Sequence, residues 1–112
     1  MTDRMQLGAA LPLSDFGGDP ITVSAYAQTA EALGYDHLCA TDHVLGVNVA
    51  SRPDWGERNT SADLFHDPFV LFGFLANATD RIGFSIQVLI LAQRQTALVA
   101  KQAACVDVLS GG

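Results

Sequence analysis

The stretch Asp36-His37-Leu38-Cys39-Ala40-Thr41-Asp42-His43 decides the fold of this chain. A short apolar run ends in an acid and an imidazole, and a long polar segment follows. In a parallel α/β chain, Asp42 and His43 then lie at the carboxyl end of a buried strand, where ligands commonly bind. Two interpretations of the pair stay open. Asp42 caps a turn while His43 satisfies a backbone carbonyl, or both side chains belong to an active site.

The segment before this stretch predicts a strand, a helix and the quoted strand. Residues 5–11 are apolar or small, as in a strand that is buried on both faces. Asp19-Pro20 is a helix start, because the acid accepts hydrogen bonds from the first turn and proline suits the first helical position. The helix is expected to reach about Leu33, where Gly34 ends it. A strand–helix–strand unit of about 30 residues makes the two strands parallel.

The second half of the chain repeats this pattern. Asp67-Pro68 starts a helix expected to reach about Thr79, and residues 82–91 form a third strand. Gln93-Arg94-Gln95-Thr96 then turns into a third helix that is expected to reach about Leu109. The predicted fold is therefore α/β, with parallel strands in a βαβαβα order. Three such units leave two bare sheet edges and much uncovered apolar surface. We expect the 112 residues to be the N-terminal part of a larger (β/α)8 TIM barrel; a dimer that buries the excess surface is the alternative.

A polar segment from Gly46 to His66 separates the two halves. Unstructured segments of this length inside a compact domain commonly serve as functional lids or are disordered. Trp55 is its one large aromatic residue, and it is expected either to anchor the segment to the body or to line a pocket.

Composition excludes several classes of function. The net charge is −6 and the six basic residues are scattered, which is the opposite of a nucleic-acid groove or a surface for anionic membranes. The longest apolar run, Phe69 to Ala76, is too short to span a bilayer, and the first six residues do not resemble a signal peptide. Cys39 and Cys105 are expected to be buried free thiols in a reducing cytoplasm, without partners at metal-ligand spacing.

The order of these signals resembles the N-terminal part of the luciferase-like monooxygenase family, whose members are flavin- or deazaflavin-dependent TIM-barrel oxidoreductases. The resemblance covers essentially residues 1–112, which would be about three of the eight barrel units. The matching segments are Leu7-Gly8, Leu11-Pro12, Ala30-Glu31-Ala32-Leu33-Gly34-Tyr35-Asp36, Thr41-Asp42-His43, Asp67-Pro68-Phe69, Arg81-Ile82-Gly83, Ala100-Lys101-Gln102-Ala103-Ala104 and Asp107-Val108-Leu109-Ser110-Gly111-Gly112.

The resemblance implies a cofactor at the carboxyl ends of the strands and a small organic substrate. Asp42-His43, in place of the Glu-His of many FMN enzymes, resembles the deazaflavin branch, so coenzyme F420 is expected and FMN is the alternative. His43 would carry a proton beside the reacting ring carbon, which suits an imidazole near neutral pH. Asp42 would orient the cofactor or hold the imidazole. A homodimer is expected for the complete protein, while the 112 residues alone are expected to bind cofactor weakly.

The family also has a non-proline cis peptide late in its third strand, and the matching bond here is Gln87–Val88. The resemblance therefore places Gln87 and Val88 at the cofactor. Considered from the residues alone, Gln87 is an outward-facing polar residue, and both interpretations remain.

Two other functions are open at this point. Asp42, His43 and His66 would be the ligands of a metal-assisted hydrolase, although the favoured interpretation includes no metal. A non-catalytic half-barrel would instead associate with other chains through its bare sheet edges.

Overall fold

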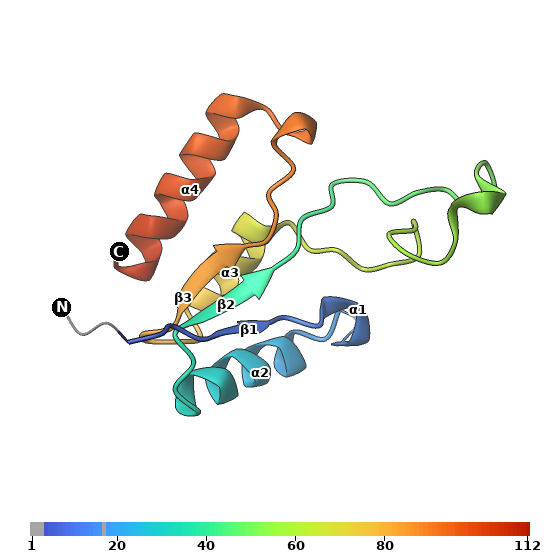
Figure 1. Ribbon diagram of the computed structural model, residues 1–112. Coiled ribbons are helices and arrows are strands. Elements are labelled where there is room, and N and C mark those ends of the chain that lie inside the picture. Colours follow the sequence, from blue (N-terminus) through green and yellow to red (C-terminus); the bar gives the residue numbers. More distant parts are fainter. Residues whose placement is uncertain (1–3, 17) are drawn as a thin grey trace.

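A computed structural model describes residues 4–16 and 18–112 of the protein (Figure 1). Met1–Asp3 and Gly17 lie outside the described residues. The expectation that the first six residues do not resemble a signal peptide therefore falls partly on residues outside this description. The strands are β1 (Gly8–Ala10), β2 (His37–Ala40) and β3 (Gly83–Ile86). The helices are α1 (Leu13–Phe16), α2 (Pro20–Ala32), α3 (Pro68–Ala76) and α4 (Thr96–Ser110), with 3-10 turns η1 (Pro53–Trp55) and η2 (Leu91–Gln93).

The three strands form one parallel sheet in the order β1-β2-β3, which confirms the α/β prediction. His37 is in register with Gly8 on one side and with Gly83 on the other. Helices alternate with the strands, and α2, α3 and α4 follow one another along the sheet (Figure 1). This is the arrangement of consecutive βα units in a TIM barrel.

Both Asp-Pro pairs begin helices, as predicted. Asp19 accepts hydrogen bonds from the N–H groups of Ile21 and Thr22 at the start of α2. Asp67 does the same for Phe69 and Val70 at the start of α3, with N···O distances of 3.0 and 3.1 Å. A carboxylate at this position satisfies N–H groups that have no partner within the helix.

The core lies between the sheet and the helices. Leu38 at the centre of β2, Ala27 of α2 and Leu75 of α3 are completely buried. They pack in one cluster with Ala9, Leu11, Leu13, Val23, Ala30, Ala40, Leu71, Phe72 and Ile82. The opposite face of the sheet is more open, since Gly8 and Ala10 are exposed. The expectation that the first strand is buried on both faces is therefore wrong for this structure.

Two strands are shorter than predicted. Regular pairing of β1 covers Gly8–Ala10, while the side chains of Met5 and Leu7 are exposed. β3 ends at Ile86 because its partner β2 ends at Ala40; the Gln87 N–H donates to the Ala40 carbonyl at 2.9 Å, and the chain then turns away. The apolar residues after Gln87 continued the sequence pattern of a strand but have no strand to pair with.

The structure also contains a short helix after β1, and it corrects the expectation for the two cysteines. Leu13–Phe16 forms a short helix, in which Leu13 is buried and the N–H groups of Asp15 and Phe16 donate to the Pro12 carbonyl. Cys105 is exposed on α4 and Cys39 is half-buried, so neither is a fully buried thiol. Within the described part of the chain, no helix combines the length and the apolar character needed to cross a membrane.

Residues 44–64 leave the end of β2, project away from the sheet and return to the start of α3 (Figure 1). A bridge between Val47 and Thr60 holds the two arms of this loop together. Trp55 neither anchors the loop to the body nor lines one of the described pockets. Its indole is half exposed and donates to the Arg58 carbonyl of the same loop at 2.8 Å.

Candidate functional site at the carboxyl ends of β2 and β3

The chain segments that follow β2 and β3 run beside each other. The Ile90 N–H donates to the Asp42 carboxylate at 3.0 Å, and the Val44 N–H donates to the Gln93 side-chain carbonyl at 3.4 Å. These bonds extend the contact between the two strands past their regular ends. His43, Gln87 and Val88 consequently lie on the same edge of the sheet, as the sequence predicts.

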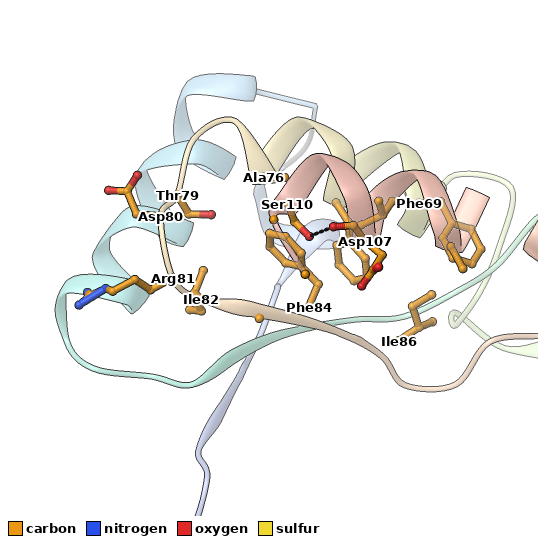
Figure 2. A pocket seen from close by; sticks show the side chains of 16 residues that line it. Phe69, Ala76, Thr79, Asp80, Arg81, Ile82, Phe84, Ile86, Asp107 and Ser110 are labelled. Carbon is orange, nitrogen blue, oxygen red and sulfur yellow. Dashed lines mark hydrogen bonds between the residues drawn. The ribbon is translucent and has the colours of Figure 1, made fainter. Parts of the chain in front are cut away.

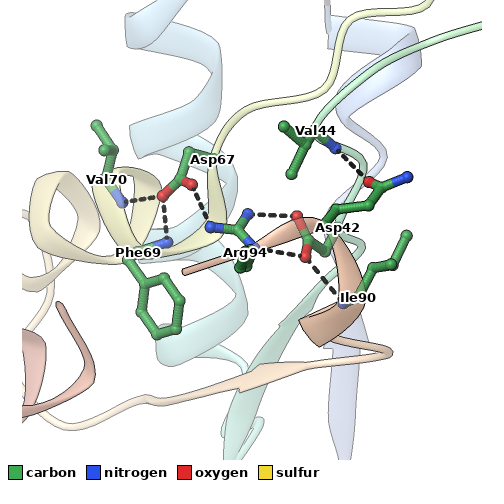
Figure 3. A network of polar contacts seen from close by, with 8 residues as sticks. Asp42, Val44, Asp67, Phe69, Val70, Ile90 and Arg94 are labelled. Atoms are coloured by element: carbon green, nitrogen blue, oxygen red, sulfur yellow. Dashed lines mark hydrogen bonds and ion pairs between the residues drawn. The ribbon is translucent and has the colours of Figure 1, made fainter. Parts of the chain in front are cut away.

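Asp42 occupies the buried side of this edge. Its side chain is fully buried and accepts from Arg94 Nε at 2.9 Å and from Arg94 Nη2 at 2.5 Å (Figure 3). These hydrogen bonds from Arg94 hold the pKa of Asp42 below its ordinary value, against the opposing effect of burial. The same ion pair raises the pKa of Arg94. At neutral pH, Asp42 is therefore an anion paired to the Arg94 cation.

The structure shows what the Asp42 carboxylate binds. It has no solvent exposure and accepts hydrogen bonds from Arg94 and the Ile90 N–H, so the protein itself engages both of its oxygens. Its hydrogen bonds also leave none for the His43 ring, whose buried Nδ1 has no partner among the described residues. Adjacent residues at a strand end project to different sides, so Asp42 turns inward and His43 turns toward the loop.

Unlike the Asp42 carboxylate, the His43 ring has a nitrogen without a hydrogen-bond partner among the described residues. Its ring is half-buried and stacks on Phe65, with the centroids 4.4 Å apart and the planes inclined by 27°. The imidazole also lines a cleft of about 280 Å³ with Val44, Asp67, Arg94, Leu98 and other residues at the start of α4. A buried ring nitrogen without a hydrogen bond is rare in folded proteins, because burial removes its water without replacing it.

The peptide bond Gln87–Val88 is cis, as the family resemblance predicts. Both side chains are exposed, and Val88 retains 77% of its accessible surface. The two interpretations of Gln87 are therefore compatible, because its side chain faces outward and its peptide bond to Val88 is cis. Other apolar side chains in the segments that follow β2 and β3 are exposed as well: Val44, Leu45 and Leu91. An apolar rim with one imidazole suits a flat aromatic ligand that offers a few polar atoms.

Arg94 is the residue of the site that sequence reasoning missed. It pairs with Asp42, with Asp67 at 2.8 Å, and lies over the Phe69 ring at 5.7 Å (Figure 3). The sequence offered one signal, a lone arginine after a long apolar run in a chain with few cations. Its partners are 52 and 27 residues away, and only the fold brings them together.

A metal site built on Asp42, His43 and His66 does not form. Arg94 occupies both oxygens of Asp42, so this carboxylate is not available as a ligand. His66 lies in a separate, largely apolar groove between α2 and α3. Across residues 4–16 and 18–112, no group of three or more His, Cys, Asp and Glu side chains has the arrangement of a metal site.

A cavity larger than the cleft beside His43 lies between α4 and the surface formed by α3 and β3 (Figure 2). It measures about 530 Å³ and is lined by Phe69, Phe84, Ile86 and the C-terminal turn of α4. The Ser110 hydroxyl there donates a hydrogen bond to the Asp107 backbone carbonyl, so these two groups are already hydrogen-bonded to each other. The cavity extends along β3 to the turn that precedes it, whereas chemistry in parallel α/β folds sits at the carboxyl ends of strands.

Comparison with known proteins identifies the family of the chain. The family model described as luciferase-like monooxygenase matches residues 5–112, nearly the whole chain. A search of curated proteins found no significant match. The match includes every element of the sheet and the site at the ends of β2 and β3. The chain therefore belongs to the luciferase-like monooxygenase family, whose members are oxidoreductases that use flavin-type cofactors.

Proposed function

We propose that the protein provides the proton-carrying edge of a cofactor site in an oxidoreductase that uses coenzyme F420 in preference to FMN and acts on a small organic substrate. The observation that carries this proposal is the His43 imidazole. It stands at the carboxyl end of β2 with a buried Nδ1 that has no protein partner among the described residues. The same ring lines the cleft at the start of α4, through which a bound ligand would reach it.

The residues present fit a flat tricyclic ring. His43 and Gln87 would offer polar contacts to the ring, and the exposed side chains of Val44, Val88 and Leu91 would cover it. When bound, a deazaflavin would supply hydride transfer at a ring carbon, and a flavin at the corresponding ring nitrogen. The preference for F420 rests on the Asp42-His43 pair of the sequence.

In this proposal His43 holds or donates the proton that accompanies hydride transfer. An imidazole exchanges protons near neutral pH, which is the requirement for an acid or base that must return to its starting state in each turnover. Phe65 keeps the ring in one orientation and excludes water from one of its faces. Asp42 contributes by holding the backbone next to His43 through its ion pair with Arg94.

We also propose that the protein is a cytoplasmic homodimer. Free cysteines suit a reducing compartment. Exposed apolar side chains on α2 and α3, among them Ile21, Val70 and Phe74, offer surface for a partner subunit.

A titration followed by NMR tests the cofactor proposal and detects weak binding. F420 or FMN is added to the protein, and the His43 ring resonances and the Gln87 and Val88 amides are recorded. We expect both groups of signals to move with F420 at concentrations about tenfold lower than with FMN, which corresponds to about 1.4 kcal/mol. His43→Gln should weaken F420 binding by a similar factor, since one hydrogen bond is lost.

His37→Gln is the matched control, because His37 begins β2 at the end opposite to the one that His43 follows. It should bind F420 like the unaltered protein. Shifts confined to the cavity between α3, β3 and α4, or equal binding by the two histidine variants, would contradict the proposed site. Tighter binding of FMN would keep the site and reverse the choice of cofactor.

A further inference from the structure

The loop of residues 44–64 leaves and re-enters the body at one narrow place. His43 is the last residue before the loop and Phe65 is the first residue after it. Their rings stack at 4.4 Å, so the ends of the loop touch directly. Inside the loop, the Val47 N–H donates to the Asn59 carbonyl and the Ser61 N–H donates to the Val47 carbonyl, both at 2.8 Å. What holds the two ends together thus also orients His43.

A single guanidinium reaches both ends of the loop. Arg94 binds Asp42, the residue before His43, through Nε and Nη2. Its third nitrogen, Nη1, donates to Asp67 Oδ2 at 2.8 Å, and Asp67 lies two residues after Phe65 (Figure 3). The planar fork of arginine suits this task, because it donates in fixed directions to two carboxylates.

The burial of these groups makes the link strong. The Arg94 side chain is 9% exposed and that of Asp42 is not exposed at all, whereas that of Asp67 is 33% exposed. Water and salt screen such a buried pair far less than a surface ion pair. The buried Arg94–Asp42 pair is consequently the fixed part of this link. The contact between Arg94 and Asp67 ties the end of the loop that returns to α3 to that pair.

We propose that Arg94 is a positioning residue that clips the two ends of the 44–64 loop together and thereby sets the stacking of His43 on Phe65. Arg94 does not contact the substrate in this role and acts through Asp42 and Asp67. The consequence for proton transfer rests on the proposed function of His43, but the clip itself is a property of the protein without cofactor.

Asp67→Asn tests the clip while sparing the fold. Asparagine keeps the side-chain oxygen that caps the N–H groups of Phe69 and Val70, and it is as good an N-cap as aspartate. The amide NH2 that replaces Oδ2 cannot accept from Arg94. Asp19→Asn is the matched control: it makes the same change at the other Asp-Pro helix start, and Asp19 forms none of the ion pairs found among the described residues.

Two NMR measurements on the cofactor-free protein report the result. The first is the upfield shift that the Phe65 ring current imposes on the His43 ring protons, with Phe65→Leu as the unstacked reference. The second is amide exchange at Val47 and Ser61, which reports opening of the loop. Asp67→Asn should remove most of the ring-current shift and speed exchange at both amides about tenfold, while Asp19→Asn leaves both unchanged.

Arg94→Lys is the second variant. Lysine keeps a cation beside Asp42 but lacks the fork that spans both carboxylates, so it should lose the His43–Phe65 stack as Asp67→Asn does. An unchanged ring-current shift in Asp67→Asn overturns the proposal, and so do equal effects of Asp67→Asn and Asp19→Asn. If Arg94→Lys does not fold, Asp67→Asn decides alone. Failure of the protein to bind F420 would refute the proposed function and leave this result untouched.

Discussion

Gly46 is a residue at which one added carbon would collide with the backbone. A Cβ built there would lie 2.2 Å from the Thr60 carbonyl oxygen and 2.7 Å from the Ser61 nitrogen. These atoms belong to the opposite arm of the 44–64 loop, next to the Val47–Thr60 bridge. Glycine is therefore what permits the two arms to approach each other.

Gly46→Ala should lower the free energy of unfolding by about 1–3 kcal/mol, because neither arm can move without losing the bridge. Gly73→Ala is the matched control in α3, where an added Cβ meets nothing within 4 Å. It should raise the free energy of unfolding by about 0.5–1 kcal/mol through helix propensity. Urea denaturation measures the free energy of unfolding of both variants. Equal values would show that the two arms of the loop can move apart to accept a Cβ at position 46.

At the scale of elements, Glu31 connects the end of α2 to the turn between α3 and β3. Its carboxylate accepts from the N–H groups of Asp80 at 3.0 Å, Arg81 at 2.6 Å and Ile82 at 2.9 Å. These bonds, that from Arg81 foremost, lower the pKa of Glu31. One side chain thus sets where β3 begins relative to the preceding helix.

Glu31→Gln should reduce the free energy of unfolding by about 1–2 kcal/mol, since a neutral amide oxygen accepts these hydrogen bonds less strongly than a carboxylate. Glu57→Gln is the control, on an exposed position of the long loop, and should change stability by less than about 0.5 kcal/mol. Chemical denaturation compares the two. If Glu31→Gln left the free energy of unfolding unchanged, whatever the result for Glu57→Gln, the turn before β3 would be held by its own backbone hydrogen bonds and not by Glu31.

For the whole molecule, the ion network of Asp42, Arg94 and Asp67 joins the ends of β2 and β3 to the start of α3. Because the pKa of Asp42 is lower in the folded than in the unfolded protein, its ionised form stabilises the fold. This stabilisation is complete above the ordinary carboxyl pKa of 3.8 and is lost as the pH falls below that value through the folded pKa.

Asp42→Asn should therefore remove part of the acid dependence of stability. At neutral pH the variant should lose about 3–5 kcal/mol, since it leaves a buried arginine without its partner. Below about pH 4 the difference from the unaltered protein should shrink. Thermal unfolding between neutral and acid pH measures this, with exposed Asp54→Asn as control. If the difference in stability between Asp42→Asn and the unaltered protein were the same at all pH values, protonation of Asp42 would not contribute to acid unfolding.

The features that the sequence determined are those with local causes. Asp19-Pro20 and Asp67-Pro68 start helices because an acid beside a proline satisfies the first N–H groups without help from distant residues. Gly34 and Gly111 follow helices in left-handed conformations that other residues avoid. The parallel order of strands follows from the length of the connections. The family and the cis bond at Gln87–Val88 came from resemblance in sequence and not from these local rules.

Tertiary structure decided what depends on residues far apart in the chain. The end of β3 was overestimated because the apolar run continues past Ile86, whereas pairing stops where β2 stops. Asp42 and His43 are adjacent in sequence, yet one enters a buried ion pair and the other faces the loop, because Arg94 is brought to the first and Phe65 to the second. Pairing partners and burial are properties of the folded chain, and no local pattern of residues contains them.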